Sequence, residues 1–258
     1  MASSPNHLLA SLIASDFDLL EPNLTTVSLM VRKDIERPNR RIEAIYFPES
    51  GIVSVVAVQK KTEVEVGLIG REGMTGLPIV LGDDRTPHST YVQVAGAGQC
   101  IPALDLASAL GTSRSLRDLL LKYVQAFGVQ TTHTAICNAR SRLDQRLARW
   151  LLMAHDRLDT NLLPLTHEFL SLMLGVRRAG VTEALHMLKT RGLIANGRSE
   201  ITVRDRKGLE RVAGQAYGIP EAEYRRLLGW AASRYRPRSA AGGEWSPAPI
   251  PWIIPGAY

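Results

Sequence analysis

Cysteines and long apolar runs are both scarce in this chain of 258 residues. No apolar run approaches the roughly 20 residues that cross a bilayer, and the N-terminal stretch lacks the basic start of a signal peptide. We therefore expect a cytoplasmic protein with no membrane partner. The two cysteines, Cys100 and Cys137, lie far apart without CxxC spacing. This excludes a disulfide framework and a four-thiolate site within one chain, and it argues against an iron–sulfur cluster.

Motifs of the common enzyme classes are absent as well. The chain has no HExxH, GxSxG or P-loop pattern, and no pair of carboxylates at a spacing that would assemble chemistry. The sequence thus predicts neither a catalytic site nor a metal site.

The net charge is concentrated in one segment. Between Ala139 and Arg211, fourteen lysines and arginines stand against eight acidic residues, a difference of +6 that equals the net charge of the whole chain. A basic excess confined to one segment is expected of a domain that binds a polyanion such as a nucleic acid, although solvated basic faces are common too.

The length fits two compact units better than one. Short runs rich in β-branched residues predict antiparallel strands between positions 40 and 105, and hence a β-roll or barrel. The expected strands are 43–47, 52–58, 63–69, 91–94 and 100–101, with residues 96–98 as a turn and an interruption over 70–89. Before them, only a short amphipathic stretch at 7–20 stands out from a weakly patterned connection.

Helical periodicity begins at Ser113. A heptad seam, with spacings of four and three, is formed by Leu116, Leu120, Tyr123, Phe127, Gln130, Thr134 and Cys137. Such a seam serves either self-association or packing of the helix on its own β-unit. We favour self-association, because a helix that joins two units is long and exposed. The expected dimerisation residues are Leu116, Leu120, Tyr123 and Phe127, and Cys137 is expected to be a buried, inert thiol.

Residues 165–194 carry the most specific pattern, after a helical segment expected at 146–157. Thr166 is placed to cap a first helix, and Gly175 to form the tight turn that ends it. The apolar face of the next helix consists of Val181, Ala184, Leu185 and Leu188. The opposite face carries Arg177, Arg178, Thr182, Glu183, His186 and Lys189.

Two adjacent arginines open this second helix. They oppose the helix dipole, and no acidic residue beside them offsets that cost, so an anion is expected there. A strand pattern at 193–195, the hairpin signal Asn196-Gly197 and a strand pattern at 201–203 follow. Helix, turn, helix and β-wing in this order predict a winged helix-turn-helix that binds double-stranded DNA.

This arrangement resembles the Crp/Fnr family of bacterial transcription regulators. The helix-turn-helix pattern of that family is similar to Thr166–Ile194, its β-roll to Ile42–Asp105 and its dimer helix to Ser113–Asn138. The resemblance implies an α+β chain whose N-terminal β-roll is like a cyclic-nucleotide-binding domain, and it implies a homodimer on a palindromic operator and contact with RNA polymerase. The implied parts are a sensor domain (1–112), a dimerisation helix (113–138) and a winged helix-turn-helix domain with C-terminal helices (139–236). Residues 237–258 are rich in proline, glycine and tryptophan and show no periodicity, so we expect a flexible tail there.

The residues that would read bases depart from the family pattern. The family commonly uses an Arg-Glu pair and a later arginine; Arg178 matches the first, but Ala179 and Glu183 replace the others, so a different operator is expected. Arg178 is suited to guanine, Glu183 to a cytosine amine and Thr182 to a thymine methyl group. The residues better placed for phosphates, which supply affinity rather than specificity, are Arg177 and Lys189.

The implied effector site is a glycine-rich cassette in the β-roll. Cyclic-nucleotide binders of the family hold the phosphate with a Gly-Glu motif and a downstream arginine, but here His88 stands where that arginine would be. A mostly neutral histidine lacks the charge and planar fork of arginine. We therefore expect no micromolar binding of cAMP, and favour a structural role for the turn. The candidate effector residues are Gly70, Arg71, Glu72, Gly73, Arg85, His88, Ser89, Thr131 and Thr132.

A signalling protein that binds cyclic nucleotides without reading DNA is the alternative function. The paired arginines and the wing speak against it.

Overall fold

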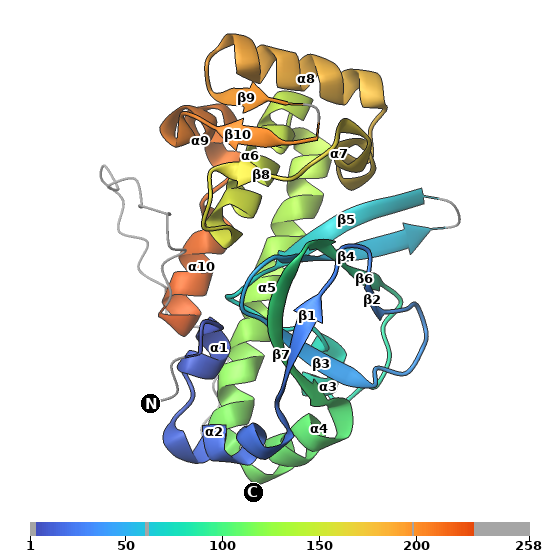
Figure 1. The fold of residues 1–258 in the computed structure, drawn as a ribbon, viewed down its shortest axis with the longest axis vertical. Coiled ribbons are helices and arrows are strands. Elements are labelled where there is room, and N and C mark those ends of the chain that lie inside the picture. Colours follow the sequence, from blue (N-terminus) through green and yellow to red (C-terminus); the bar gives the residue numbers. More distant parts are fainter. Residues whose placement is uncertain (1–3, 60–61, 198, 230–258) are drawn as a thin grey trace, which may run out of the picture.

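The computed structural model describes residues 4–59, 62–197 and 199–229. It consists of two units stacked along the longest axis, a β-roll and a mainly helical unit, with helix α5 (Arg114–Arg140) running along the roll towards the helical unit (Figure 1). The expected α+β class is confirmed. Among the residues described, no helix has both the length and the apolar character needed to cross a membrane.

The β-roll is made of two antiparallel sheets, with strand orders β1-β7-β3 and β2-β6-β4-β5. Its strands are β1 (Thr25–Leu29), β2 (Asp34–Glu36), β3 (Ala44–Pro48), β4 (Ile52–Gln59), β5 (Thr62–Ile69), β6 (Ser89–Val94) and β7 (Gly96–Pro102). In β4, Val53 and Val55 pack inside the roll, whereas Ile52 and Val56 join the apolar core of the helical unit. The first five residues of β4 are therefore buried on both faces of the sheet, which is why they are all apolar apart from Ser54.

Three expectations for the roll were wrong. Strands β1 and β2 lie in the stretch expected to be a connection. They gave no strand pattern in the sequence, because β1 has only one buried residue and β2 has only three residues in all. Residues 96–98 are not a turn but the start of β7. Strand β3 pairs with β7 rather than with its neighbour β4, so the expected consecutive pairing holds only for β4 and β5.

Short helices close the ends of the roll. The amphipathic stretch at 7–20 forms α1 (His7–Ala10) and α2 (Ala14–Leu20), and a 3-10 turn, η1 (Glu21–Asn23), follows. Asn6 caps α1, and its side-chain amide also donates to the carbonyl oxygens of Pro48 and Gly73. The interruption at 70–89 contains α3 (Leu77–Val80), and α4 (Ala103–Thr112) leads into α5.

Helix α5 begins where the periodicity predicted, with the Ser113 side chain accepting from the backbone amide of Leu116 at 3.1 Å. Its heptad seam, however, faces the chain's own units. The side chains of Leu116, Leu120, Tyr123 and Phe127 are at most 6% exposed within one chain. Their interpretation as dimerisation residues was wrong, because a side chain already buried in its own protomer has no surface left for a partner. Cys137 is a buried free thiol, as expected.

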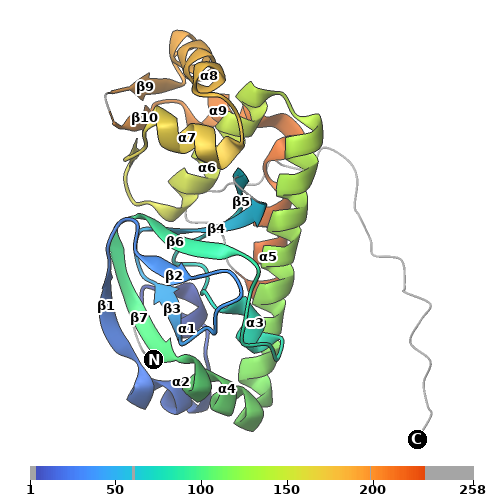
Figure 2. The same cartoon turned by 90° about the vertical axis from the view of Figure 1, so that its right-hand side faces the viewer.

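A second heptad series lies on the opposite face of α5. Leu121, Gln125, Thr132 and Ala135 are exposed, and a side-chain carbon added at Gly128, between them, would meet nothing within 4 Å. Figure 2 shows α5 along one edge of the molecule, with one side of the helix facing outward.

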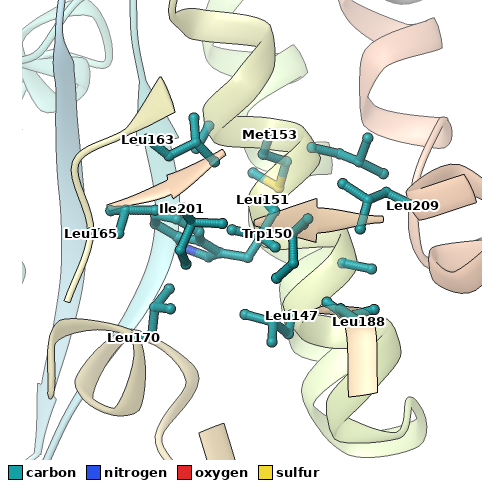
Figure 3. Packing of buried hydrophobic residues seen from close by; sticks show 14 of the residues in the cluster. Leu147, Trp150, Leu151, Met153, Leu163, Leu165, Leu170, Leu188, Ile201 and Leu209 are labelled. Carbon is teal, nitrogen blue, oxygen red and sulfur yellow. The ribbon is translucent and has the colours of Figure 1, made fainter. Parts of the chain in front are cut away.

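The helical unit is built around α6 (Leu143–Arg157), in which every residue from Leu147 to Arg157 is buried. Figure 3 shows Trp150 and Leu151 of α6 surrounded by apolar side chains from later elements. The remaining elements of the unit are β8 (Leu162–Leu163), α7 (His167–Leu174), α8 (Arg178–Thr190), β9 (Ile194–Asn196), β10 (Ile201–Val203), α9 (Arg206–Ala213), η2 (Gly214–Ala216) and α10 (Ile219–Leu228).

Helix α10 returns from the helical unit and packs along α5 (Figure 1). The Tyr224 ring lies 6.3 Å from the Tyr123 ring, between centroids, and its hydroxyl is 3.3 Å from the amide nitrogen of Gln130. Leu228 joins the apolar cluster that contains Leu8 of α1. The chain's last described helix thus holds the two units together. The tail expected over 237–258 lies outside the described residues.

Candidate nucleic-acid interface

The helix-turn-helix forms at the predicted place. The Thr166 hydroxyl accepts from the backbone amide of Phe169 at 3.1 Å and caps α7. Gly175 ends that helix with φ 61°, a left-handed conformation that glycine adopts without steric cost. Helix α8 begins three residues later, after a turn short enough to fix the crossing of the two helices.

The two faces of α8 divide as its sequence pattern predicted. Val181, Ala184, Leu185 and Leu188 are buried and hold the helix on the core formed by α6. The exposed side chains of the opposite face are Arg178, Thr182, Glu183, His186 and Lys189, with Arg177 just before the helix. In Figure 1 this helix lies at the end of the molecule farthest from the β-roll, and no other element lies beyond its outer side.

The N-terminus of α8 carries unbalanced positive charge. Arg177 occupies the cap position without a side-chain hydrogen bond to the helix, and the first turn contains no acidic residue. Over the described ranges, no ion pair involves Arg177, Arg178 or Lys189. Exposed cations that form no ion pair are available for the phosphates of a nucleic acid.

The wing follows α8 directly. Strands β9 and β10 are antiparallel, with Ile201 opposite Asn196, and β8 pairs with the other edge of β10. Residue 198, at the tip of the hairpin, is outside the described residues. Strand β8 was not predicted, because two residues beside Pro164 give no strand pattern.

The excess charge of the 139–211 segment is only partly at this surface. Arg149 and Arg157 are 5% and 7% exposed, and they lie inside the molecule. Arg206 is bound to the buried Asp156 at 2.7 Å. Burial raises the pKa of Asp156 to about 6, even though Arg206 opposes that shift. Counting charges along the sequence therefore overstated the charge that can face DNA.

One residue that connects the interface was not predicted. His167, at the start of α7, has Nδ1 at 3.1 Å from the Thr182 hydroxyl and Nε2 at 3.0 Å from the side-chain amide nitrogen of Asn196. The sequence offered no signal for it, because the contact depends on how the wing folds back towards α7.

The glycine-rich cassette of the β-roll is filled by the chain itself. Glu72 forms an ion pair of 2.7 Å with Arg157 of α6, and this guanidinium also donates to the carbonyl oxygens of Met153 and Leu68. A side-chain carbon at Gly70 would lie 2.7 Å from Cγ of Arg157, and one at Gly73 would collide with the Tyr123 ring. Both glycines are thus explained by the close approach of the chain's own side chains.

The other candidate effector residues have partners within the protein or lie outside the cassette. Arg71 pairs with Asp159 at 2.6 Å, and Arg85 with Asp84 at 3.3 Å. His88 lies 3.2 Å from the Thr86 hydroxyl, and burial lowers its pKa, which favours the uncharged ring. The hydroxyls of Thr131 and Thr132 donate to the carbonyl oxygen of Gly128 in their own helix, α5. Ser89 is the first residue of β6.

Arg157 and Asp159 were therefore missed as partners of the cassette. Nothing in the sequence near position 157 marks it as the partner of a residue 85 positions earlier. Within the described part of the chain, no group of three or more histidine, cysteine, aspartate or glutamate side chains is arranged to hold a metal ion.

Comparison with known families identifies the helical unit. A family model described as the Crp-like helix-turn-helix domain matches residues 145–212, which include most of α6, the helix-turn-helix and the wing. No curated protein matches the chain in sequence.

Solved structures share most of the fold at low sequence identity. A protein from Eubacterium rectale assigned to the Crp/Fnr family of transcriptional regulators is 20% identical, with a TM-score of 0.64 over 80% of this chain and 97% of that one. FixK2 from Bradyrhizobium japonicum is 17% identical, with a TM-score of 0.62 over 73% and 96%. The c-di-GMP responsive regulator CLP of Xanthomonas campestris is 19% identical, with a TM-score of 0.57 over 74% and 99%.

Proposed function

We propose that this chain, which carries a Crp-like helix-turn-helix in a fold similar to that of Crp/Fnr regulators, is a DNA-binding transcription regulator of that family that reads a palindromic operator as a homodimer. The exposed, unpaired cationic face at the start of α8 is the observation that supports this most directly. A helix of this kind enters the major groove with its N-terminal residues at the base edges.

The reading chemistry follows from the exposed side chains of α8. Arg178 can donate two hydrogen bonds to O6 and N7 of guanine, and Glu183 can accept one from the amine of cytosine. Thr182 offers a methyl group to thymine. Arg177 and Lys189 bind phosphates, and they set affinity and its salt dependence. His186 lies on the same exposed face. The N-terminus of α7, which Thr166 caps, approaches the phosphate backbone of the DNA.

The second heptad series of α5 is the surface that we propose for the dimer. Its small residues, Gly128, Thr132 and Ala135, allow two helices to approach closely, and Leu121 adds apolar area at one end. Two protomers joined along α5 would present two α8 helices to successive major grooves, about 34 Å apart. Contact with RNA polymerase is the remaining partner that we expect for such a regulator.

The effector, if one acts, is not expected to be cAMP. A cyclic phosphate buried in the roll requires a fixed cation and several donors. Glu72 is already bound to Arg157, and Arg85 to Asp84. We propose that the cassette serves as a joint between the two units and that DNA binding is constitutive. Calorimetry with cAMP and cGMP tests this: saturable micromolar binding that is lost in Arg71→Ala or Arg85→Ala would refute it.

Selection of bound duplexes from a random DNA library tests the function itself. We expect enrichment of an imperfect palindrome whose half-sites are centred about 10 base pairs apart, or a multiple of that spacing. A cyclic-nucleotide signalling protein without DNA readout would enrich no sequence, and that result would overturn the proposal.

A further inference from the structure

The imidazole of His167 joins the three elements that would face DNA. His167 is the first residue of α7, Thr182 lies in the middle of α8, and Asn196 is the last residue of β9, where the wing turns. The ring contacts Thr182 through Nδ1 at 3.1 Å and Asn196 through Nε2 at 3.0 Å. No other side chain in the described residues is hydrogen-bonded to both α8 and β9.

The donors and acceptors of these contacts form one consistent series of hydrogen bonds. The amide nitrogen of Asn196 can only donate, so Nε2 accepts and the neutral ring carries its proton on Nδ1. Nδ1 then donates to the Thr182 hydroxyl. That hydroxyl in turn donates to the backbone carbonyl oxygen of Arg178, at 3.1 Å. Both ring nitrogens of His167 and the Thr182 hydroxyl therefore have partners within the protein.

This series of hydrogen bonds determines which atoms of each residue remain available for DNA. Both ring nitrogens of His167 are engaged within the protein, so the ring has no nitrogen left for a base or a phosphate. The hydroxyl of Thr182 is engaged as well, which leaves its methyl group for contact with a base. The guanidinium of Arg178 has no hydrogen-bond or ion-pair partner among the residues that the structure describes, while its backbone carbonyl oxygen is linked through Thr182 to His167.

We propose that His167 is a positioning residue for sequence readout, which holds the recognition helix and the wing at a fixed spacing. This inference rests on the proposed function. Base contacts require side chains placed to within about half an ångström, whereas phosphate contacts by long cationic side chains tolerate displacement and carry no sequence information. Loss of the imidazole therefore weakens binding to the selected sequence and leaves binding to random DNA almost unchanged.

The test compares His167→Ala and Asn196→Ala on two duplexes of equal length at one salt concentration, the sequence selected by the wild-type protein and a random sequence. Each substitution removes one or two partly exposed hydrogen bonds, so affinity for the selected duplex should fall about three- to tenfold. Affinity for the random duplex should change less than about twofold. The double variant should resemble His167→Ala, since Asn196 acts through the ring.

Thr182→Val and Thr190→Val form a matched pair of controls. The Thr190 hydroxyl makes the same type of bond, to the carbonyl oxygen of His186 at 3.0 Å, but lies at the end of α8. Thr182→Val should lose preference for the selected duplex, and Thr190→Val should keep it. These variants and Asn196→Ala carry the test if His167→Ala proves unfolded by circular dichroism.

Three results would overturn the inference. Equal loss on both duplexes in His167→Ala would indicate general destabilisation, and no loss would show that the ring is dispensable. Loss in His167→Ala alone, with Asn196→Ala and Thr182→Val unchanged, would mean that the ring touches DNA itself. If instead the wild-type protein selects no sequence, the proposed function fails first.

Discussion

Glu65 of β5 shows how one buried side chain couples the two units. One carboxylate oxygen accepts from the indole nitrogen of Trp150 in α6 at 2.5 Å, and the other accepts from the Ser54 hydroxyl at 2.7 Å. Burial raises the pKa of Glu65 to about 7, and these hydrogen bonds together with Arg149 and Arg157 only partly oppose that rise. The side chain is thus neutral in mildly acidic solution and ionised in alkaline solution.

Glu65→Gln is expected to remove a pH dependence of stability. Because the pKa of Glu65 is higher in the folded than in the unfolded chain, the native state binds the extra proton, and this contribution is fully present below the unfolded value of about 4.5. It is lost as the pH rises to about 7, and the loss amounts to as much as about 3 kcal/mol. Glutamine has the same shape and no charge, so the variant should be more stable than wild type at pH 8.

Urea unfolding at pH 5, 6, 7 and 8 measures this effect. The difference between wild type and Glu65→Gln should grow with pH, and Glu63→Gln, an exposed neighbour on the same strand, should show no such trend. A constant difference over this range would show that Glu65 titrates near its ordinary value.

Single residues were predictable where their role depends on local sequence. The cap at Thr166, the turn at Gly175 and the exposed side of α8 follow from periodicity and conformational preference, and the structure has all three. His167 and Arg157 were not predictable, because their partners lie on elements that come together only in the folded chain.

At the scale of elements, α5 carries two heptad series on opposite faces. The period correctly gave the residues that share a face, but it could not tell which face the chain itself covers. The first series was interpreted as the dimer seam because its side chains are longer and more apolar. In the structure, the roll and α10 bury that series. The smaller series remains exposed.

A charge on the second series should separate the dimer. Thr132 is exposed on α5, so Thr132→Glu should leave the protomer folded and place two like charges close to the two-fold axis. Light scattering at micromolar concentration should give a dimer for wild type and a monomer for Thr132→Glu. Lys122→Glu, exposed on the same helix but off this series, serves as the control and should stay dimeric. A dimeric Thr132→Glu variant would place the interface elsewhere.

Across the whole molecule, the two units meet through ion pairs of different burial. Arg157 and Glu72 have side chains that are 8% and 16% exposed, whereas Asp159, which pairs with Arg71, is 72% exposed. Removing one partner of a buried pair leaves an uncompensated charge and costs about 3–5 kcal/mol. An exposed pair contributes about 0–1 kcal/mol.

Glu72→Gln should therefore lower the free energy of unfolding by a few kcal/mol, and Asp159→Asn by less than about 1 kcal/mol. Urea unfolding at pH 7.5 measures both variants. If the two substitutions cost the same, the cassette would not act as a joint between the units.

The overall architecture was predictable further than its internal contacts. The order of β-roll, long helix and winged helix-turn-helix follows from where the hydrophobic period changes from two to 3.6 residues. The pairing of β3 with β7 and the return of α10 to α5 involve residues far apart in the sequence. Such contacts depend on how the chain folds back, which no local pattern records.

The central claim is that α8 reads DNA sequence, and the affinities of Arg178→Ala and Lys189→Ala for the selected and the random duplex test it most directly. Arg178→Ala should lose about 1–3 kcal/mol on the selected duplex, with relaxed preference at one guanine, and almost nothing on the random one. Lys189→Ala should weaken both duplexes alike and reduce the slope of log affinity against log salt by about one. Equal effects of Arg178→Ala on the two duplexes would contradict the account.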